Sequence, residues 1–130
     1  MKIFILLAMF FCHIVDDYYL QGVLAKMKQK KWWAEQTDDE MYKHDYLAAL
    51  IAHSFSWSFM IMLPWFIYTL CKNENRIIVL IPMFIGNIIC HAIVDNAKAN
   101  KYCINLITDQ LLHVFQIVST YVTLLILLGV

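Results

Sequence analysis

Histidine and aspartate residues recur at helical spacing within long apolar stretches of this 130-residue sequence. Members of three His/Asp pairs stand four residues apart, which puts both side chains of a pair on one face of a helix. The pairs are His13 with Asp17, His91 with Asp95, and Asp109 with His113. Neutral imidazole and carboxylate together bind zinc, manganese or iron. The spacing therefore predicts a divalent metal site, and His53, on another apolar stretch, is a seventh candidate ligand.

Such a set of ligands could hold two ions and activate a water molecule as a nucleophile. We therefore predict a metal-dependent hydrolase that acts on a phosphoester or another anionic group, carried by a small molecule or a lipid headgroup. In this hypothesis Asp16 is the general base and Lys98 faces the anionic group of the substrate. The polar stripes continue through Gln21, Asn87 and Gln116, which we expect to point the same way.

Two other functions use the same residues. Histidine and carboxylate chains also conduct protons or cations through transporters and channels. A small accessory protein without catalysis could use polar side chains only to join its helices, and a single histidine or aspartate in a bundle often does no more. Each charged side chain at membrane depth costs roughly 2.5 to 3.5 kcal/mol on insertion scales, so several kept together favour a functional site.

The elements that must position these residues are apolar helices. Hydrophobic residues make up 62% of the chain and the mean hydropathy is +0.61, which is too apolar for an ordinary soluble domain. A membrane helix needs roughly 20 apolar residues. The sequence predicts four, at residues 2–24, 44–71, 76–97 and 102–130, in an all-α, single-domain transmembrane bundle over residues 1–130. Because four helices leave little room for a cavity, a homo-oligomer is also expected.

The lysines predict the orientation of the bundle. Most of them lie in residues 25–43, a basic interfacial loop, and in residues 98–101, and both connections fall on one face. The positive-inside rule places that face in the cytoplasm and both termini outside, for a protein of the inner membrane. The tryptophans beside the lysines favour lipid headgroups over nucleic acid as partners. Measured from the same face at about 1.5 Å per residue, four side chains are expected roughly 10 to 15 Å deep: Asp16, His53, His91 and Asp109. His13 and His113 are expected slightly deeper, and Asp95 and Lys98 nearer the mouth.

Three segments also resemble a known family. They are HIVDDYYLQ from residue 13, HAIVDNAK from residue 91 and TDQLLH from residue 108, and together they are similar to the small bacterial and phage membrane proteins of domain-of-unknown-function family 3307. The pattern His-x-x-x-Asp-x-x-Lys followed by Asp-Gln-x-x-His matches His91, Asp95, Lys98, Asp109, Gln110 and His113. The first segment matches through His13, Asp17 and Gln21, with Asp16 as an extra acid. The resemblance implies that these residues act together, and it implies no particular reaction.

Overall fold

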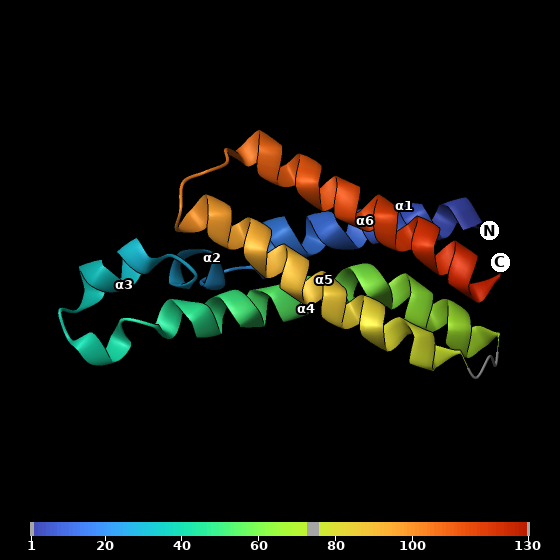
Figure 1. The fold of residues 1–130 in the computed structure, drawn as a ribbon, viewed down its shortest axis with the longest axis horizontal. Helices are drawn as coiled ribbons and strands as arrows, with labels where there is room; N and C mark the ends of the chain where they lie inside the picture. The colour runs from blue at the N-terminus through green and yellow to red at the C-terminus, as the bar shows by residue number, and fades with distance from the viewer. Residues whose placement is uncertain (1, 73–75, 130) are drawn as a thin grey trace.

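Four long helices dominate the computed structural model, which describes residues 2–72 and 76–129 (Figure 1). The long helices are α1 (Lys2–Val15) with a π-helical continuation η1 (Asp16–Leu20), α4 (Asp45–Cys71), α5 (Ile77–Ala99) and α6 (Leu106–Leu128). Between the first two lie α2 (Leu24–Met27), α3 (Lys30–Gln36) and a 3-10 turn η2 (Glu40–Tyr42). The described residues contain no strand, so the all-α prediction is confirmed.

The prediction of four apolar helices is confirmed. Within the described residues, four helical spans are long and apolar enough to cross a membrane: Lys2–Leu20, Glu40–Cys71, Ile77–Ala99 and Leu106–Leu128. Helix α1 packs against α4 and α6, and α5 packs against the same two helices. The two termini lie at one end of the bundle, while α2, α3 and the α5–α6 connection lie at the other (Figure 1). We call this second end, formed by residues 21–44 and 100–105, the basic end.

Local backbone geometry corrects two predicted helix boundaries. The first span ends at Leu20 instead of residue 24, because Gly22 takes a left-handed conformation with φ +50°. The last helix begins at Leu106 instead of residue 102, because Tyr102 has φ 55° and the Asn105 side chain accepts a hydrogen bond from the Thr108 backbone N–H. Its predicted end at residue 130 lies outside the described residues. The basic loop predicted at 25–43 contains α2, α3 and η2.

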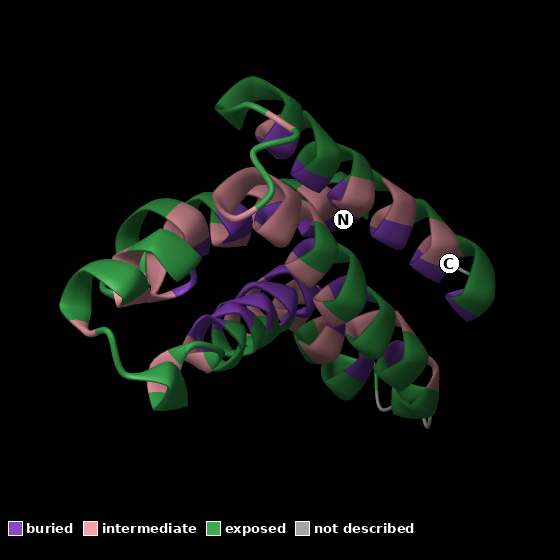
Figure 2. Cartoon of the chain, turned by 60° about the vertical axis from the view of Figure 1, so that its left-hand side comes forward, coloured by how far each residue is buried: buried purple, intermediate pink, exposed green. Residues whose placement is uncertain are grey.

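The interior of the bundle has an apolar half and a polar half. Buried positions lie on the helix faces that turn towards one another (Figure 2). Ten buried apolar residues form one cluster: Ile5, Met9, Trp57, Ile61, Met62, Trp65, Leu80, Ile117, Leu124 and Leu128. Most of these residues belong to the helix halves near the termini. The buried histidines and aspartates therefore occupy the half of the interior nearer the basic end.

The left-handed turn at Gly22 can be tested against a second glycine. We expect Gly22→Ala to lower the free energy of unfolding by about 1 kcal/mol, because a Cβ disfavours positive φ. Gly86 lies inside α5 with no atom within 4 Å of an added Cβ. Gly86→Ala should leave the stability unchanged or raise it by up to about 1 kcal/mol. Unfolding in detergent measures both, and equal losses for the two variants would contradict this account of the turn.

Candidate metal centre

The three predicted His/Asp pairs are all in contact across one turn of helix. His13 Nδ1 lies 3.5 Å from Asp17 Oδ2, His91 Nε2 lies 3.7 Å from Asp95 Oδ2, and His113 Nε2 lies 3.5 Å from Asp109 Oδ1. All six side chains are at least nine-tenths buried, as is His53. The helical spacing read from the sequence therefore predicted real neighbours.

His53, on α4, contacts acidic residues on both η1 and α5. Its Nε2 atom lies 3.5 Å from Asp17 Oδ1 on η1, and 3.3 Å from Asp95 Oδ2 on α5. The same nitrogen lies 3.1 Å from His91 Nε2 and 3.0 Å from the side-chain nitrogen of Gln21. Asp17, His53 and His91 each turn one potential ligand atom to a common point, and these atoms lie within 4.8 Å of one another. They form the first candidate metal group.

The second candidate metal group consists of His91, Asp95 and His113, with the same limit of 4.8 Å between ligand atoms. Asp95, a member of the second group, also contacts the first group. Its Oδ2 atom faces His53, while its Oδ1 atom lies 3.4 Å from His113 Nε2. Asp109 approaches His113 from the same helix. Since His91 belongs to both groups and Asp95 contacts residues of both, the groups form one continuous centre.

The hydrogen bonding of this centre is incomplete in a way that a cation would complete. The Nε2 atoms of His53 and His91 face each other, and one proton at most can lie between them. Two buried carboxylate oxygens, Asp17 Oδ1 and Asp109 Oδ1, have no hydrogen-bond partner. A buried acceptor without a partner costs about 1 to 3 kcal/mol, and more when it is charged. Imidazole nitrogen and carboxylate oxygen suit zinc, manganese or iron, so the donor set fits a divalent ion.

Two lysines contact the acids of this centre from the side of the basic end. Lys98 Nζ lies 2.6 Å from Asp109 Oδ2, and its predicted contact with a substrate anion stays a prediction. Lys28 Nζ lies 2.5 Å from Asp95 Oδ2, and Lys28 is buried. Sequence reasoning missed Lys28, because it stands among several lysines of the same loop and no spacing distinguishes it. The path of α2 over the mouth of the bundle brings it inward.

A cavity of about 350 Å³ connects the centre to the basic end. Its lining residues come from η1, α5, α6, α2 and the connecting segments. They are Asp17, Tyr18, Gln21, Ala25, Lys28, Gln29, Asp95, Lys98, Ala99, Tyr102, Leu106, Asp109 and Gln110. Because ligand carboxylates and both lysines line it together, we call it the reaction cavity. An anion that entered it would meet both ammonium groups.

Trp57 closes the centre on the side of the apolar cluster. Its ring stacks on His91 with centroids 4.1 Å apart, and His91 stacks on His113 at 4.3 Å. The indole N–H donates a hydrogen bond of 2.8 Å to His13 Nδ1. This bond occupies a lone pair of His13, which belongs to neither candidate group. The ligand role of His13 therefore stays a prediction.

The π-helical turn η1 carries Asp16 and Asp17 to opposite sides of His53. Asp16 Oδ1 accepts a hydrogen bond of 2.6 Å from the Ser56 hydroxyl, and its Oδ2 lies 3.7 Å from His53 Nδ1. Asp17 instead faces Nε2. Carboxylates on the far nitrogen of a ligand histidine commonly orient the ring. The structure thus places Asp16 behind His53, and its role as general base stays a prediction.

Two residues of the predicted stripes belong to a separate polar network. Gln116 Nε2 donates a hydrogen bond of 2.8 Å to Asn87 Oδ1, and the Thr120 hydroxyl donates one of 3.0 Å to the same oxygen. These bonds join α5 to α6, and neither Asn87 nor Gln116 belongs to a candidate metal group. They are the interhelical hydrogen bonds that membrane bundles commonly use.

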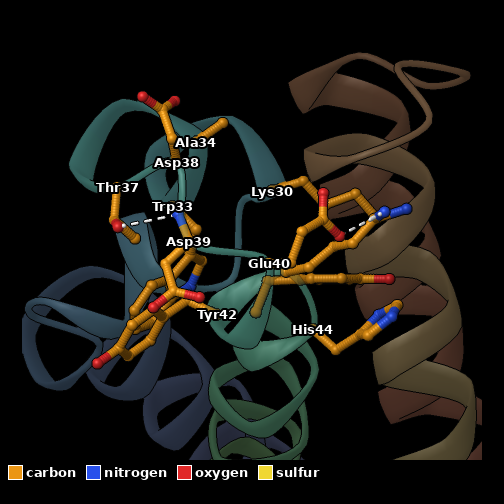
Figure 3. Close-up of a pocket in the computed structure, with 11 residues that line it drawn as sticks. Lys30, Trp33, Ala34, Thr37, Asp38, Asp39, Glu40, Tyr42 and His44 are labelled. Atoms are coloured by element: carbon orange, nitrogen blue, oxygen red, sulfur yellow. Dashed lines mark hydrogen bonds and ion pairs between the residues drawn. The ribbon is translucent and has the colours of Figure 1, made fainter.

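A second cavity, of about 390 Å³, lies between α3 and the start of α4 (Figure 3). Trp33 stacks on Tyr42 there, with ring centroids 6.2 Å apart, and Lys43 pairs with Glu40 at 3.0 Å. None of its lining residues belongs to the candidate metal groups or to the reaction cavity. It is a feature of the interfacial segment.

Comparison with known proteins finds no matching family model, curated protein or solved structure. The fold and the site define the class on their own. The chain is an all-helical protein with four helices long and apolar enough to span a membrane, and with buried His/Asp groups that could hold a metal ion.

Proposed function

We propose that this protein is a membrane-embedded, metal-dependent hydrolase of phosphoesters. The observation that carries the proposal is the pair of buried His/Asp groups, joined through His91 and Asp95, at the base of a cavity lined by two lysines. The Nε2 atoms of His53 and His91 face each other there, and two carboxylate oxygens, each 3.5 Å from a histidine nitrogen, accept no hydrogen bond.

Each side chain has a definable part in this chemistry. Asp17, His53 and His91 would hold one zinc, manganese or iron ion. Asp95 and His113, which share His91 with the first group, would hold a second, with Asp109 beside His113. Ions held in this way polarise phosphoryl oxygens and activate water. Lys28 and Lys98 would release their carboxylates to the ions and bind the anionic group of the substrate.

The reaction consumes one water molecule. The water oxygen forms a bond to phosphorus, and the bond between phosphorus and the alcohol oxygen breaks. One proton of the water passes to a carboxylate of the centre, and the leaving alcohol takes up a proton. The products are the free alcohol and inorganic phosphate, and no oxidant or reductant is needed.

One feature favours a closed site over a conducting path. The half of the bundle near the termini is filled by the apolar cluster, which includes the fully buried Ile61, Trp65 and Leu124. A proton or cation path would need polar groups or water through that half. All the candidate ligands also come from one chain, so the proposal does not require the homo-oligomer expected from the sequence.

The proposal includes an orientation and a family. Lysines gather at the basic end, which we place in the cytoplasm of a bacterial or phage-infected cell on the positive-inside rule. Membership of domain-of-unknown-function family 3307 is part of the proposal, and the residues of its motif lie together. Lys98 and Gln110 line the reaction cavity beside Asp95 and Asp109, and His91 and His113 lie in the second metal group.

Phosphate release from a phosphomonoester by the detergent-purified protein tests this function. We expect turnover to stop when a chelator removes the metal and to return when zinc, manganese or iron is added back. A protein that carries no transition metal, or that dissipates a pH gradient in liposomes without one, would contradict the proposal.

A further inference from the structure

A crevice between α1 and α6 opens on the side of the bundle, next to the reaction cavity. It has a volume of about 500 Å³. The residues that line it are Phe10, His13, Ile14, Tyr18, Tyr19, Gln110 and Val114. All of them belong to the spans Lys2–Leu20 and Leu106–Leu128, so in a bilayer the crevice faces lipid.

The crevice and the reaction cavity share a wall. Tyr18 and Gln110 line both of them. The Gln110 amide donates to Asp17 Oδ2 at 3.5 Å and to Asp109 Oδ2 at 3.2 Å, so this side chain lies between the crevice and the acids of the metal centre. A molecule lying in the crevice would therefore lie against the Gln110 side chain, whose amide contacts two acids of the centre.

The crevice is mainly apolar and the reaction cavity is polar and contains two lysines, which matches the acyl chains and the anionic headgroup of a lipid. The crevice is lined mainly by apolar and aromatic side chains, and Ile14 and Tyr19 are 48% and 78% exposed. The reaction cavity carries the ammonium groups of Lys28 and Lys98. Tyrosines close to the end of a span are typical of the membrane interface, which is the level of phosphate headgroups. An acyl chain suits the first space and a phosphate the second.

We propose that the substrate is a membrane lipid with a phosphate-monoester headgroup, which enters sideways between α1 and α6. This inference rests on the proposed function. Water attacks the phosphorus, the bond between phosphorus and the lipid oxygen breaks, and the lipid alcohol takes a proton. The lipid alcohol returns to the bilayer through the crevice, and inorganic phosphate leaves through the reaction cavity at the basic end.

A bulky residue in the crevice separates this route from entry through water. Val114 lines the crevice, whereas Leu111, which is 62% exposed on the same helix, does not. We expect Val114→Trp to lower hydrolysis of dioleoyl phosphatidic acid in vesicles by about ten-fold or more, because the headgroup can no longer reach its position. Hydrolysis of the water-soluble p-nitrophenyl phosphate should remain, and Leu111→Trp should change neither rate. Retained metal content in Val114→Trp confirms that the variant is folded.

Other outcomes tell the two proposals apart. Equal loss on both substrates, or undiminished phosphatidic acid turnover in Val114→Trp, would overturn lateral entry and leave the hydrolase intact. Turnover of the soluble ester alone by the unmodified protein would do the same. If neither substrate is hydrolysed, the proposed function fails. Native mass spectrometry then tests separately whether the crevice binds a lipid. Preferential retention of phosphatidic acid over phosphatidylcholine, lost in Val114→Trp, would support lipid binding in the crevice. Equal retention of the two lipids would overturn it.

Discussion

Replacing His91 by alanine should lower the affinity of the purified protein for zinc or manganese by about 100-fold or more. His91 belongs to both candidate metal groups, so the substitution removes a ligand from each of them. His91→Phe should have the same effect while keeping a ring against Trp57, whose indole stacks on His91 at 4.1 Å. Elemental analysis after purification in detergent, together with calorimetric titration, measures the loss.

His44→Ala is the matched control for this experiment. His44 is exposed, lies at the start of α4 and belongs to neither metal group. It should retain the metal content of the unmodified protein. Undiminished metal in both His91 variants would show that the convergence of side chains is only interhelical packing, and the hydrolase would lose its basis.

Replacing Lys28 by methionine should change protein stability and metal affinity in opposite directions. The Lys28–Asp95 pair is buried, and removal of one partner of such a pair costs about 3 kcal/mol or more, because the remaining charge loses its counter-ion. The metal-free protein should therefore unfold more easily. A divalent ion would no longer have to displace an ammonium group or lie near it, so metal affinity should rise by about ten-fold or more.

Lys26→Met provides the comparison for this second prediction. Lys26 lies two residues earlier in α2, and its side chain is exposed. It should alter neither the unfolding of the metal-free protein nor its metal titration. A fall in both quantities for Lys28→Met would mean that Lys28 supports the shape of the site and does not compete with the ion.

Much of the candidate site could be predicted from spacing alone. A separation of four residues places His91 and Asp95 on one face whatever surrounds the helix, and the 3.7 Å contact follows from that. Depth could also be predicted, because rise per residue is constant and each span has a recognisable polar end. Helical spacing and depth together predicted that ligands from four helices lie at about the same level. Backbone details at Gly22 and Tyr102 moved the span boundaries without moving the site.

Contacts between helices could not be predicted in the same way. Spacing shows which residues share a face, but not which neighbouring helix that face meets. Asn87 and Gln116 lie on the same stripes as the ligands, yet packing directs them to each other. Asp16 and Asp17 are adjacent acids, and only the π-helical turn places them on different nitrogens of His53.

The sequence by itself determined that four apolar helices carry histidine and aspartate at matching depth. The tertiary structure decided that Asp95 contacts residues of both ligand groups, that Lys28 reaches it from the loop, and that a crevice opens between α1 and α6. The physical reason is that the helical repeat and the hydrophobic effect act along each segment. The angle and distance between segments depend instead on how all their side chains pack together.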